Sequence, residues 1–363
     1  MKNTFGNNVS ITLFGESHGE AIGAVIDGLA PGLEVDNDFI SSQLSLRRPV
    51  GNISTPRAEK DEFKILSGVF EGKTTGTPIC IVILNENIKS ADYGEIRFKM
   101  RPSHADFTAN AKYHGFEDYR GGGHFSGRVT AGLVAAGAIA INALQRKGIK
   151  IGTHISKIAG VCDRGFENYE TDIDVLNKMT FAVLDSAKGD EMQNKILQAR
   201  EQLDSVGGVL ETAVIGLPEG VGEPWFDSIE SMISHGLFSI PAVKGVEFGA
   251  GFSIADMKGS EANDSFVANN GAVETATNYN GGINGGITNG MPIIFRTAIK
   301  PTPTIGKEQN TIDIRDNSNV VLEAKGRHDP CIVHRARVVV DSIVAITLCD
   351  MLAARFGTDW MAL

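Results

Sequence analysis

Five short segments of the chain either alternate hydrophobic and polar residues or contain runs of β-branched residues. This pattern predicts β-strands at residues 9–14, 21–26, 78–84, 209–215 and 292–299. Apolar residues at helical spacing predict helices over residues 36–47, 105–114, 188–206 and 332–355. Because strands and helices do not alternate regularly along the chain, the pattern favours an α+β fold over a doubly wound parallel sheet.

The stretch 128–144 is apolar on nearly all sides, which is typical of a helix buried on more than one face, here between two layers of sheet. Its core, residues 131–144, contains Asn142 and two glycines and is too short to span a bilayer. The first ten residues lack the apolar centre of a signal peptide. Together these features predict a cytoplasmic protein without a membrane segment.

The composition is typical of a globular protein and argues against several classes of function. Hydrophobic residues make up 42% of the 363 positions, which is enough to build a core. The net charge of −10 argues against nucleic-acid binding, which needs a basic face. Four widely separated cysteines without a CxxC pair indicate neither a zinc framework nor a disulfide scaffold. No linker divides the chain, so we expect residues 1–363 to form one domain.

Five segments punctuated by glycine or proline carry the unusual polar chemistry. They are GESHGE (15–20), RPSHAD (101–106), RGGGHFSGR (120–128), KPTPT (300–304) and GRHDP (326–330). We expect them in loops beside strands and helices, where a rigid scaffold usually places reactive groups. The triple glycine before the apolar helix could expose backbone N–H groups to an anion. It could equally be a flexible turn with Ser126 as the helix cap, and the residues alone leave both interpretations open.

Three histidines lie within two residues of an acid: His18, His104 and His328. A nearby carboxylate can tune a histidine, which titrates near neutrality. Arginines at 47, 48 and 57 and Lys300 can bind phosphate or carboxylate groups. The residues therefore indicate acid–base chemistry on a phosphorylated or carboxylated small molecule.

Two other functional classes compete with this interpretation. The first is a metal-dependent hydrolase that uses His18, His104, His124 and Asp329. We expect no metal site, because the chain has no HExxH motif and these histidines are not at helical ligand spacing, although a site built from scattered residues stays open. The second is a non-enzymatic flavin- or nucleotide-binding module, against which the histidine–acid pairs argue, since a passive binder needs no proton donors.

Longer motifs in these segments resemble the chorismate synthase family. GESHGEAIGAVIDG (15–28), GGGHFSGRVTAGLVAAGAIA (121–140) and GRHDPC (326–331) resemble the three signature segments of that family, in the same order. RPSHAD, AVKGVEFG (242–249), GGINGGITNG (281–290) and KPTPT resemble further landmarks. The resemblance runs from about Phe5 to the C-terminal helix, and several long motifs in order are far more specific than one glycine pattern.

The resemblance implies a single large domain in which helices are packed between antiparallel sheets, with approximate internal two-fold symmetry. It implies the 1,4-anti elimination of phosphate from 5-enolpyruvylshikimate 3-phosphate to give chorismate, a carbon–oxygen lyase step of the shikimate pathway of aromatic amino-acid biosynthesis. The reaction requires reduced FMN without net redox change. We find no separate reductase segment, so we expect an external reductant, either a flavin reductase or NADPH. A homotetramer is also implied.

The resemblance also assigns residue roles. It implies that His18 protonates the reduced flavin, that His104 donates a proton to the leaving phosphate, and that Asp329 assists removal of the C6 proton at flavin N5. Ser17 and Ser126 are implied as proton relays. Flavin contacts are implied at His124, Phe125, Ser126, Pro241, Ala242, Gly285, Lys300, Pro301, Thr302, Pro303, Thr304 and Arg327. A further cofactor contact is implied at Arg47, and substrate contacts at Arg48, Arg57 and Arg128.

The chain departs from the family pattern in four places. His124 stands where the family often has arginine, and Pro241 replaces a usual asparagine, which restricts that contact to the backbone. The segment between Pro49 and Ser54 is short and lacks an arginine, which leaves Arg47 as the main candidate there for an NADPH or substrate contact. Asp341 replaces a usual glutamate, which we expect to change a helix contact rather than the chemistry.

Overall fold

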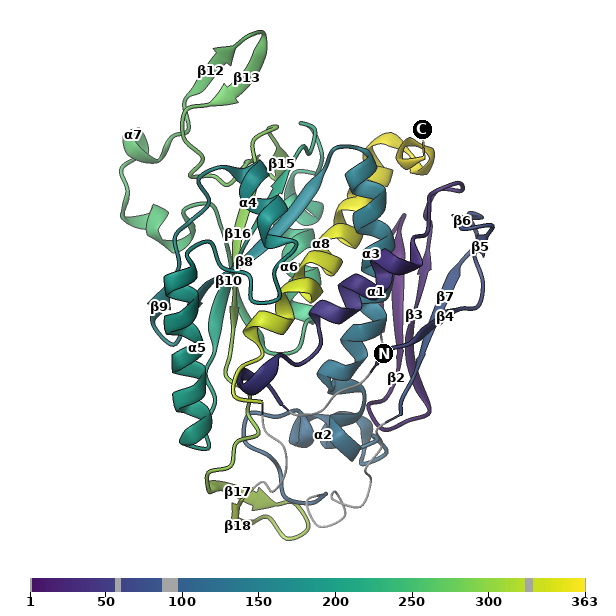
Figure 1. The fold of residues 1–363 in the computed structure, drawn as a ribbon, viewed down its shortest axis with the longest axis vertical. Helices are drawn as coiled ribbons and strands as arrows, with labels where there is room; N and C mark the ends of the chain where they lie inside the picture. The colour runs from purple at the N-terminus through teal and green to yellow at the C-terminus, as the bar shows by residue number, and fades with distance from the viewer. Residues whose placement is uncertain (1, 56–59, 87–96, 324–328, 363) are drawn as a thin grey trace.

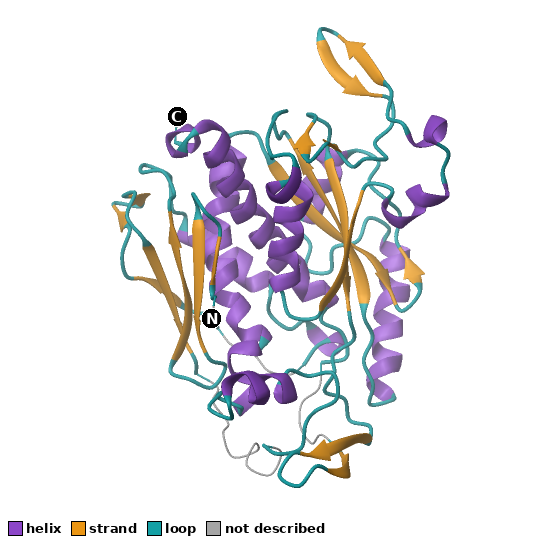
Figure 2. Cartoon of the chain, turned by 180° about the vertical axis from the view of Figure 1, so that it is seen from behind, coloured by secondary structure: helices purple, strands orange, loops and turns teal. Residues whose placement is uncertain are grey.

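The computed structural model describes residues 2–55, 60–86, 97–323 and 329–362. Its main body is two antiparallel five-stranded sheets with helices between them (Figures 1 and 2). The first sheet has the order β1-β2-β3-β7-β4 and the second the order β11-β16-β10-β8-β9. The strands are β1 (Thr4–Phe5), β2 (Ser10–Gly15), β3 (Ala21–Asp27), β4 (Phe63–Ile65), β7 (Ile79–Leu84), β8 (Lys150–Ile158), β9 (Val161–Cys162), β10 (Gly208–Ile215), β11 (Val243–Phe248) and β16 (Ile293–Ile299).

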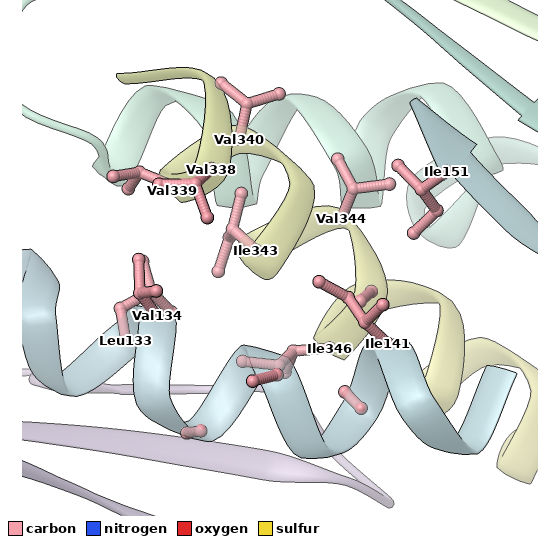
Figure 3. Close-up of a cluster of buried hydrophobic side chains, with 14 of the residues drawn as sticks. Leu133, Val134, Ile141, Ile151, Val338, Val339, Val340, Ile343, Val344 and Ile346 are labelled. Atoms are coloured by element: carbon pink, nitrogen blue, oxygen red, sulfur yellow. The ribbon is translucent and has the colours of Figure 1, made fainter. Parts of the chain in front are cut away.

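Four helices form the layer between the sheets: α1 (Asn37–Leu46), α3 (Thr130–Arg146), α6 (Ile229–Ser239) and α8 (Val333–Phe356). Helix α3 packs against β3 of the first sheet, α8 packs against β8 and β10 of the second, and the two helices pack against each other. Figure 3 shows Leu133 and Val134 of α3 beside Val338, Val339 and Ile343 of α8. Buried residues from both halves thus belong to one hydrophobic core. This shared core supports a single domain over residues 1–363, which stays a prediction.

Glycines let α3 approach both of its neighbours closely. A Cβ at Gly132 would lie 2.6 Å from the backbone of Gly23 in β3, and a Cβ at Gly137 would lie 2.3 Å from Cβ of Ser342 in α8. The segment Gly127–Arg146 is long and apolar enough to cross a membrane by length and composition, yet 89% of its apolar stretch is buried inside the protein. It is therefore the core helix that its all-round apolar pattern predicts.

The outer face of the second sheet is covered by α4 (Tyr169–Leu176) and α5 (Ser186–Glu201). Successive residues of β8 point to opposite faces. Thr153 Oγ1 bonds to Asp341 of α8 at 2.6 Å, whereas the next residue, His154, lies on the outer face. The His154 imidazole sits between two carboxylates, 2.9 Å from Asp163 and 3.0 Å from Glu211. Burial lowers the pKa of His154, but these two carboxylates outweigh burial and raise it above its ordinary value of 6.5.

Most of the remaining elements lie toward the two ends of the molecule, whereas the short strands within residues 69–74 lie at its side, beside the first sheet (Figure 1). The β12–β13 hairpin extends from one end, whereas α2 and the β17–β18 hairpin lie at the other. These elements are β5 (Val69–Phe70), β6 (Lys73–Thr74), α2 (Asp106–Tyr113), α7 (Gly259–Ala262), β12 (Phe266–Asn269), β13 (Ala272–Thr275), β14 (Ile283–Asn284), β15 (Ile287–Thr288), β17 (Gln309–Asp313) and β18 (Ser318–Leu322).

The structure confirms the α+β class, with mixed helices and antiparallel sheets. All five expected strands and all five expected helices are present. The helix expected at 188–206 is wrong at its end: it stops at Glu201, because Leu203 adopts a left-handed backbone with φ of 58°. Each sheet packs on one long helix, α3 or α8, which fits the expected two-fold relation.

Candidate active site

Ser17 and His18 occupy the centre of a tight turn between β2 and β3. The Gly19 N–H donates to the Glu16 carbonyl at 3.1 Å and closes the turn. Both central side chains are buried, His18 with 5% of its surface exposed. Ser17 Oγ lies 2.9 Å from His18 Nδ1, so the hydroxyl and the ring form a bonded pair of fixed orientation. The GESHGE segment is therefore an ordered turn that holds a proton-carrying ring beside a hydroxyl.

A glycine loop lies directly against this turn. Within Arg120–Phe125, Gly121 and Gly122 have φ values of 60° and 87°, which favour glycine. A Cβ at Gly121 would lie 2.1 Å from His18 Cε1, and one at Gly122 would lie 3.3 Å from His104 Nε2. The absence of side chains at two consecutive positions thus lets two histidines lie against one loop.

Backbone hydrogen bonds hold the loop and the turn together. The Ser17 N–H donates to the Gly123 carbonyl at 3.0 Å, and His124 Nδ1 lies 2.8 Å from the Gly15 carbonyl. His124, expected to contact the flavin, therefore also fixes the loop to β2. The Ser126 hydroxyl accepts from the Arg128 N–H at 3.2 Å, so it caps the short helix Gly127–Val129. The capping interpretation of Ser126 is thus the one observed, and its relay role stays a prediction.

His104 is oriented by an acid and an arginine from its own segment. Its Nδ1 lies 2.6 Å from Asp106 Oδ1 at the start of α2. Arg101 donates to the same carboxylate from Nε at 2.7 Å and from Nη2 at 2.8 Å. Burial raises the pKa of Asp106, but the bonds from His104 and Arg101 outweigh it and hold that pKa well below its usual range. Asp106 is therefore a carboxylate that fixes the His104 ring.

A cluster of cations lies on the other side of the histidine turn. Arg47, at the end of α1, and Arg128 both pair with the buried carboxylate of Asp61, Arg47 at 3.6 Å. Arg128 also donates from Nε to Asn85 Oδ1 at 3.0 Å and from Nη2 to the Leu84 carbonyl at 3.3 Å. These bonds hold the Arg128 guanidinium against the protein, and its expected contact with the substrate stays a prediction.

Asp329 lies just before α8 and next to that cluster. Arg335 pairs with Asp329 Oδ2 and also donates from Nε to the Arg47 carbonyl at 2.8 Å. Burial raises the pKa of Asp329, and the charge of Arg335 offsets only part of this increase. Asp329 Oδ1 is buried and has no hydrogen-bond partner among the described residues. A buried carboxyl group with a raised pKa and an unused oxygen is suited to proton exchange with a ligand.

The KPTPT segment joins the site from the end of β16. Lys300 donates from its backbone N–H to the Ala242 carbonyl at 3.0 Å and from Nζ to the Ser103 carbonyl at 2.5 Å, one residue before His104. Burial and the nearby Lys244 charge lower the pKa of Lys300. Thr302 Oγ1 is buried and has no hydrogen-bond partner within the described ranges. Lys300 and Ala242, both expected flavin contacts, are thus brought to the histidine loops.

The structure does not bring every expected residue to this cluster. Gly285 lies in the β14–β15 turn, at the end of β16 opposite to Lys300. Arg48 is exposed and donates to the Lys60 carbonyl. Phe125, by contrast, lines the same pocket as His104 and Gly122, although it is 38% exposed and packs edge-on against Tyr113. Three candidates, Arg57, Arg327 and His328, lie outside the described residues.

Four residues that build this geometry were not expected from the sequence: Asp61, Asn85, Arg101 and Arg335. Arg101 carried a local signal, because arginine, histidine and aspartate lie within the six residues of RPSHAD. Asp61 and Asn85 had none, since their partner Arg128 is far away in the sequence. Arg335 lies six residues after Asp329, but its contact with the Arg47 carbonyl spans 288 residues. Within the described ranges no group of three or more His, Cys, Asp or Glu side chains could hold a metal ion. The scattered ligand set of the hydrolase alternative is therefore not assembled there.

Comparisons with known proteins agree with this geometry. A family model described as chorismate synthase matches residues 9–353. A chorismate synthase from Thermococcus kodakarensis is 45% identical over 356 residues, which cover 98% of this chain and 99% of that protein. One from Dehalococcoides mccartyi is 45% identical over 358 residues, which cover 98% of both chains. A crystal structure of chorismate synthase matches with a TM-score of 0.76 and 29% identity, covering 98% of this chain and 95% of that one.

These matches confirm the family resemblance and the expected fold. They also confirm the enzyme class, because chorismate synthase is a carbon–oxygen lyase of aromatic amino-acid biosynthesis. The non-enzymatic alternative is thereby set aside, and the metal-dependent hydrolase with it. The chain belongs to the chorismate synthase family.

Proposed function

We propose that the site eliminates phosphate from 5-enolpyruvylshikimate 3-phosphate, in the 1,4-anti sense, to give chorismate with reduced FMN bound. The observation that carries the proposal is the convergence of the Ser17–His18 pair and the His104–Asp106 pair on one glycine loop. The KPTPT segment lies beside them through Lys300. Two imidazole rings and a lysine side chain therefore lie at one place in the fold, an arrangement suited to general acid–base assistance and to a phosphate leaving group.

The residues present fit a flavin. Thr302 Oγ1 and Asp329 Oδ1 are buried polar atoms that lack a partner among the described residues, and a ligand with both hydrogen-bond donors and acceptors would satisfy them. Reduced FMN, when bound, supplies an electron-rich ring system that eases departure of the allylic phosphate. The residues that would hold it are His124, Phe125, Ser126, Pro241, Ala242 and Lys300–Thr304, with Arg47 nearby; Gly285 lies at the far end of β16.

His104 is the proposed donor to the leaving phosphate. Its Nδ1 is held by Asp106, so Nε2, which faces Gly122, is the atom that delivers the proton. A positioned general acid of this kind contributes a factor of roughly 10² to 10⁴ to the rate. The neighbouring Lys300 ammonium stabilises the negative charge that develops on the phosphate.

His18 and Asp329 are the proposed groups for the remaining proton. Asp329 assists removal of the C6 proton, for which its raised pKa and its unpartnered Oδ1 are suited. His18 holds a proton beside the reacting centre, and the Ser17 hydroxyl bonded to its ring is the proposed relay. Arg48 and Arg128 remain the proposed substrate contacts in the described part of the chain. The NADPH or flavin-reductase supply, the cytoplasmic location and the homotetramer stay predictions.

An anaerobic assay tests the proposal. The purified chain is mixed with 5-enolpyruvylshikimate 3-phosphate and chemically reduced FMN, with oxidised FMN and a chelator as parallel arms. We expect chorismate only with reduced FMN and the same rate with the chelator. Flavin-independent turnover, or turnover that the chelator abolishes, would contradict the proposal.

A further inference from the structure

Asn85 follows β7 and contacts the turn that carries His18. Its side-chain Nδ2 donates to the Glu16 carbonyl at 3.0 Å and to the Gly19 carbonyl at 2.9 Å. Its backbone N–H donates to the Glu20 carbonyl at 3.0 Å. One asparagine thus makes three hydrogen bonds to the segment 16–20.

The two side-chain bonds reach both ends of the tight turn. Glu16 and Gly19 are its end residues, and Ser17 and His18 are its central residues. Glycines lie at positions 15 and 19 on either side of the central residues, and Gly15 has a φ of 93°. Because glycine adopts many backbone conformations, the chain there can move more freely than at other residues. An amide group that bonds to both end carbonyls restricts this freedom and with it the position of the His18 ring.

The opposite side of the same amide contacts the arginine cluster. Asn85 Oδ1 accepts from Arg128 Nε at 3.0 Å. Arg128 pairs in turn with the buried carboxylate of Asp61, which Arg47 also approaches at 3.6 Å. The two donors and the acceptor of the amide are therefore all used, and they join segments that are more than 40 residues apart.

We infer that Asn85 is a positioning residue that clamps the Ser17–His18 turn and ties it to the Arg47–Asp61–Arg128 cluster. The inference rests on the proposed function only for the catalytic role of His18. Asparagine fits this place because it offers two donors and an acceptor on one rigid group. Aspartate would keep the acceptor for Arg128 but would set a carboxylate against the two carbonyl oxygens, and alanine would remove all three bonds.

A double-mutant cycle tests whether Asn85 acts through His18. Asn85→Asp and Asn85→Ala are each made in the wild-type chain and in the His18→Ala chain. In the wild-type chain we expect kcat to fall by about tenfold to a hundredfold, because a shift of about 1 Å in a reacting group has effects of this size. KM for 5-enolpyruvylshikimate 3-phosphate should change by less than about threefold. In the His18→Ala chain neither substitution should lower kcat further.

A matched control separates this effect from a general loss of structure. Asn289 also donates from its side chain, to Asn284 Oδ1 at 2.7 Å, but lies just after β15 at the far end of β16. Asn289→Ala should leave kcat per folded molecule unchanged. Additive losses of kcat in the His18→Ala chain would overturn the inference.

Hydrogen exchange provides a readout that does not depend on turnover. The Gly19 N–H, which closes the turn, should exchange at least tenfold faster in Asn85→Asp and Asn85→Ala than in wild type or Asn289→Ala. Aspartate is nearly isosteric, so this variant keeps the test open if the alanine variant does not fold. An unchanged exchange rate of the Gly19 N–H in both Asn85 variants would overturn the inference that Asn85 clamps the turn. If instead His18→Ala retains wild-type turnover, the proposed role of His18 fails. The exchange rate of the Gly19 N–H then still tests whether Asn85 holds the turn in place.

Discussion

Replacing Gly121 with alanine would place a methyl group where the His18 ring lies. The added Cβ would be 2.1 Å from His18 Cε1, 2.3 Å from Nδ1 and 2.7 Å from Ser17 Oγ. Moving the ring out to an ordinary contact of 3.4 Å needs a shift of about 1.3 Å. Misplacement of a reacting group by about 1 Å can cost about a hundredfold in rate, so we expect kcat to fall by about that factor.

The substitution also strains the backbone, and this effect must be separated from the clash. Gly121 has a φ of 60°, and a residue with a Cβ in that conformation costs about 1–2 kcal/mol. Strain lowers the free energy of unfolding but does not change the rate of a folded molecule. Gly148, just after α3, has a φ of 75° and nothing within 4 Å of its Cβ position. Gly148→Ala is therefore the control for strain alone.

A second control places a methyl group near the site without strain. Gly127 lies at the end of the same loop, lacks a positive φ and has nothing within 4 Å of its Cβ position. The three variants are compared by thermal unfolding and by anaerobic turnover at saturating substrate. We expect Gly121→Ala to lose both stability and kcat, Gly148→Ala to lose only stability, and Gly127→Ala to lose neither. Wild-type kcat per folded molecule in Gly121→Ala would refute the reasoning, as would an equal loss in Gly127→Ala.

Three further substitutions test separate parts of the structure. Asp106→Asn should lower kcat by about tenfold to a hundredfold, because an amide no longer fixes the His104 ring as a carboxylate does; unchanged steady-state kinetics would remove Asp106 from the mechanism. Gly137→Ala should cost about 1–3 kcal/mol in urea unfolding, since its Cβ would lie 2.3 Å from Ser342 Cβ; no loss would mean that the two helices separate freely. The raised pKa of His154 makes its charged form stabilise the fold below pH 6.5, and this stabilisation is lost as pH rises through the raised value. The difference in unfolding free energy between wild type and His154→Gln should therefore shrink as pH rises above that value, and a difference that grows would show that the neutral ring is the stabilising form.

Much of the fold follows from local pattern. The all-round apolar α3 is recognisable because neighbours pack on both of its sides and leave a continuous hydrophobic sequence. Strand β7 is recognisable from its run of β-branched residues. Strand β8 escaped prediction because Gly152, Thr153 and His154 interrupt its hydrophobic pattern. Those residues are nevertheless buried, since helices cover both faces of the second sheet. Asp341 of α8 accepts from Thr153, and Asp163 and Glu211 bond to His154. Pattern alone cannot show that such partners exist.

The candidate site likewise contains some residues that the sequence indicates and others that only the structure reveals. His18 and His104 could be proposed from sequence because the acids and glycines around them are adjacent in the chain. Asp61 and Asn85 could not, because their importance arises from contacts with Arg128, 67 and 43 residues away. Arg128 was expected from residue type to contact an anionic ligand, which stays a prediction. Its bonds to Asn85 and to the Leu84 carbonyl could not be foreseen, because these partners are more than 40 residues away.

The most direct test of the account is turnover of His18→Ala per folded molecule, assayed without oxygen with reduced FMN. Because the ring is buried and bonded to Ser17, its removal should also cost about 0.5–3 kcal/mol in stability, so melting alone does not decide its role. The account predicts that the folded variant still binds flavin but turns over at least about a hundredfold more slowly between about pH 6 and 9. A variant that melts early but turns over at the wild-type rate per folded molecule would contradict it.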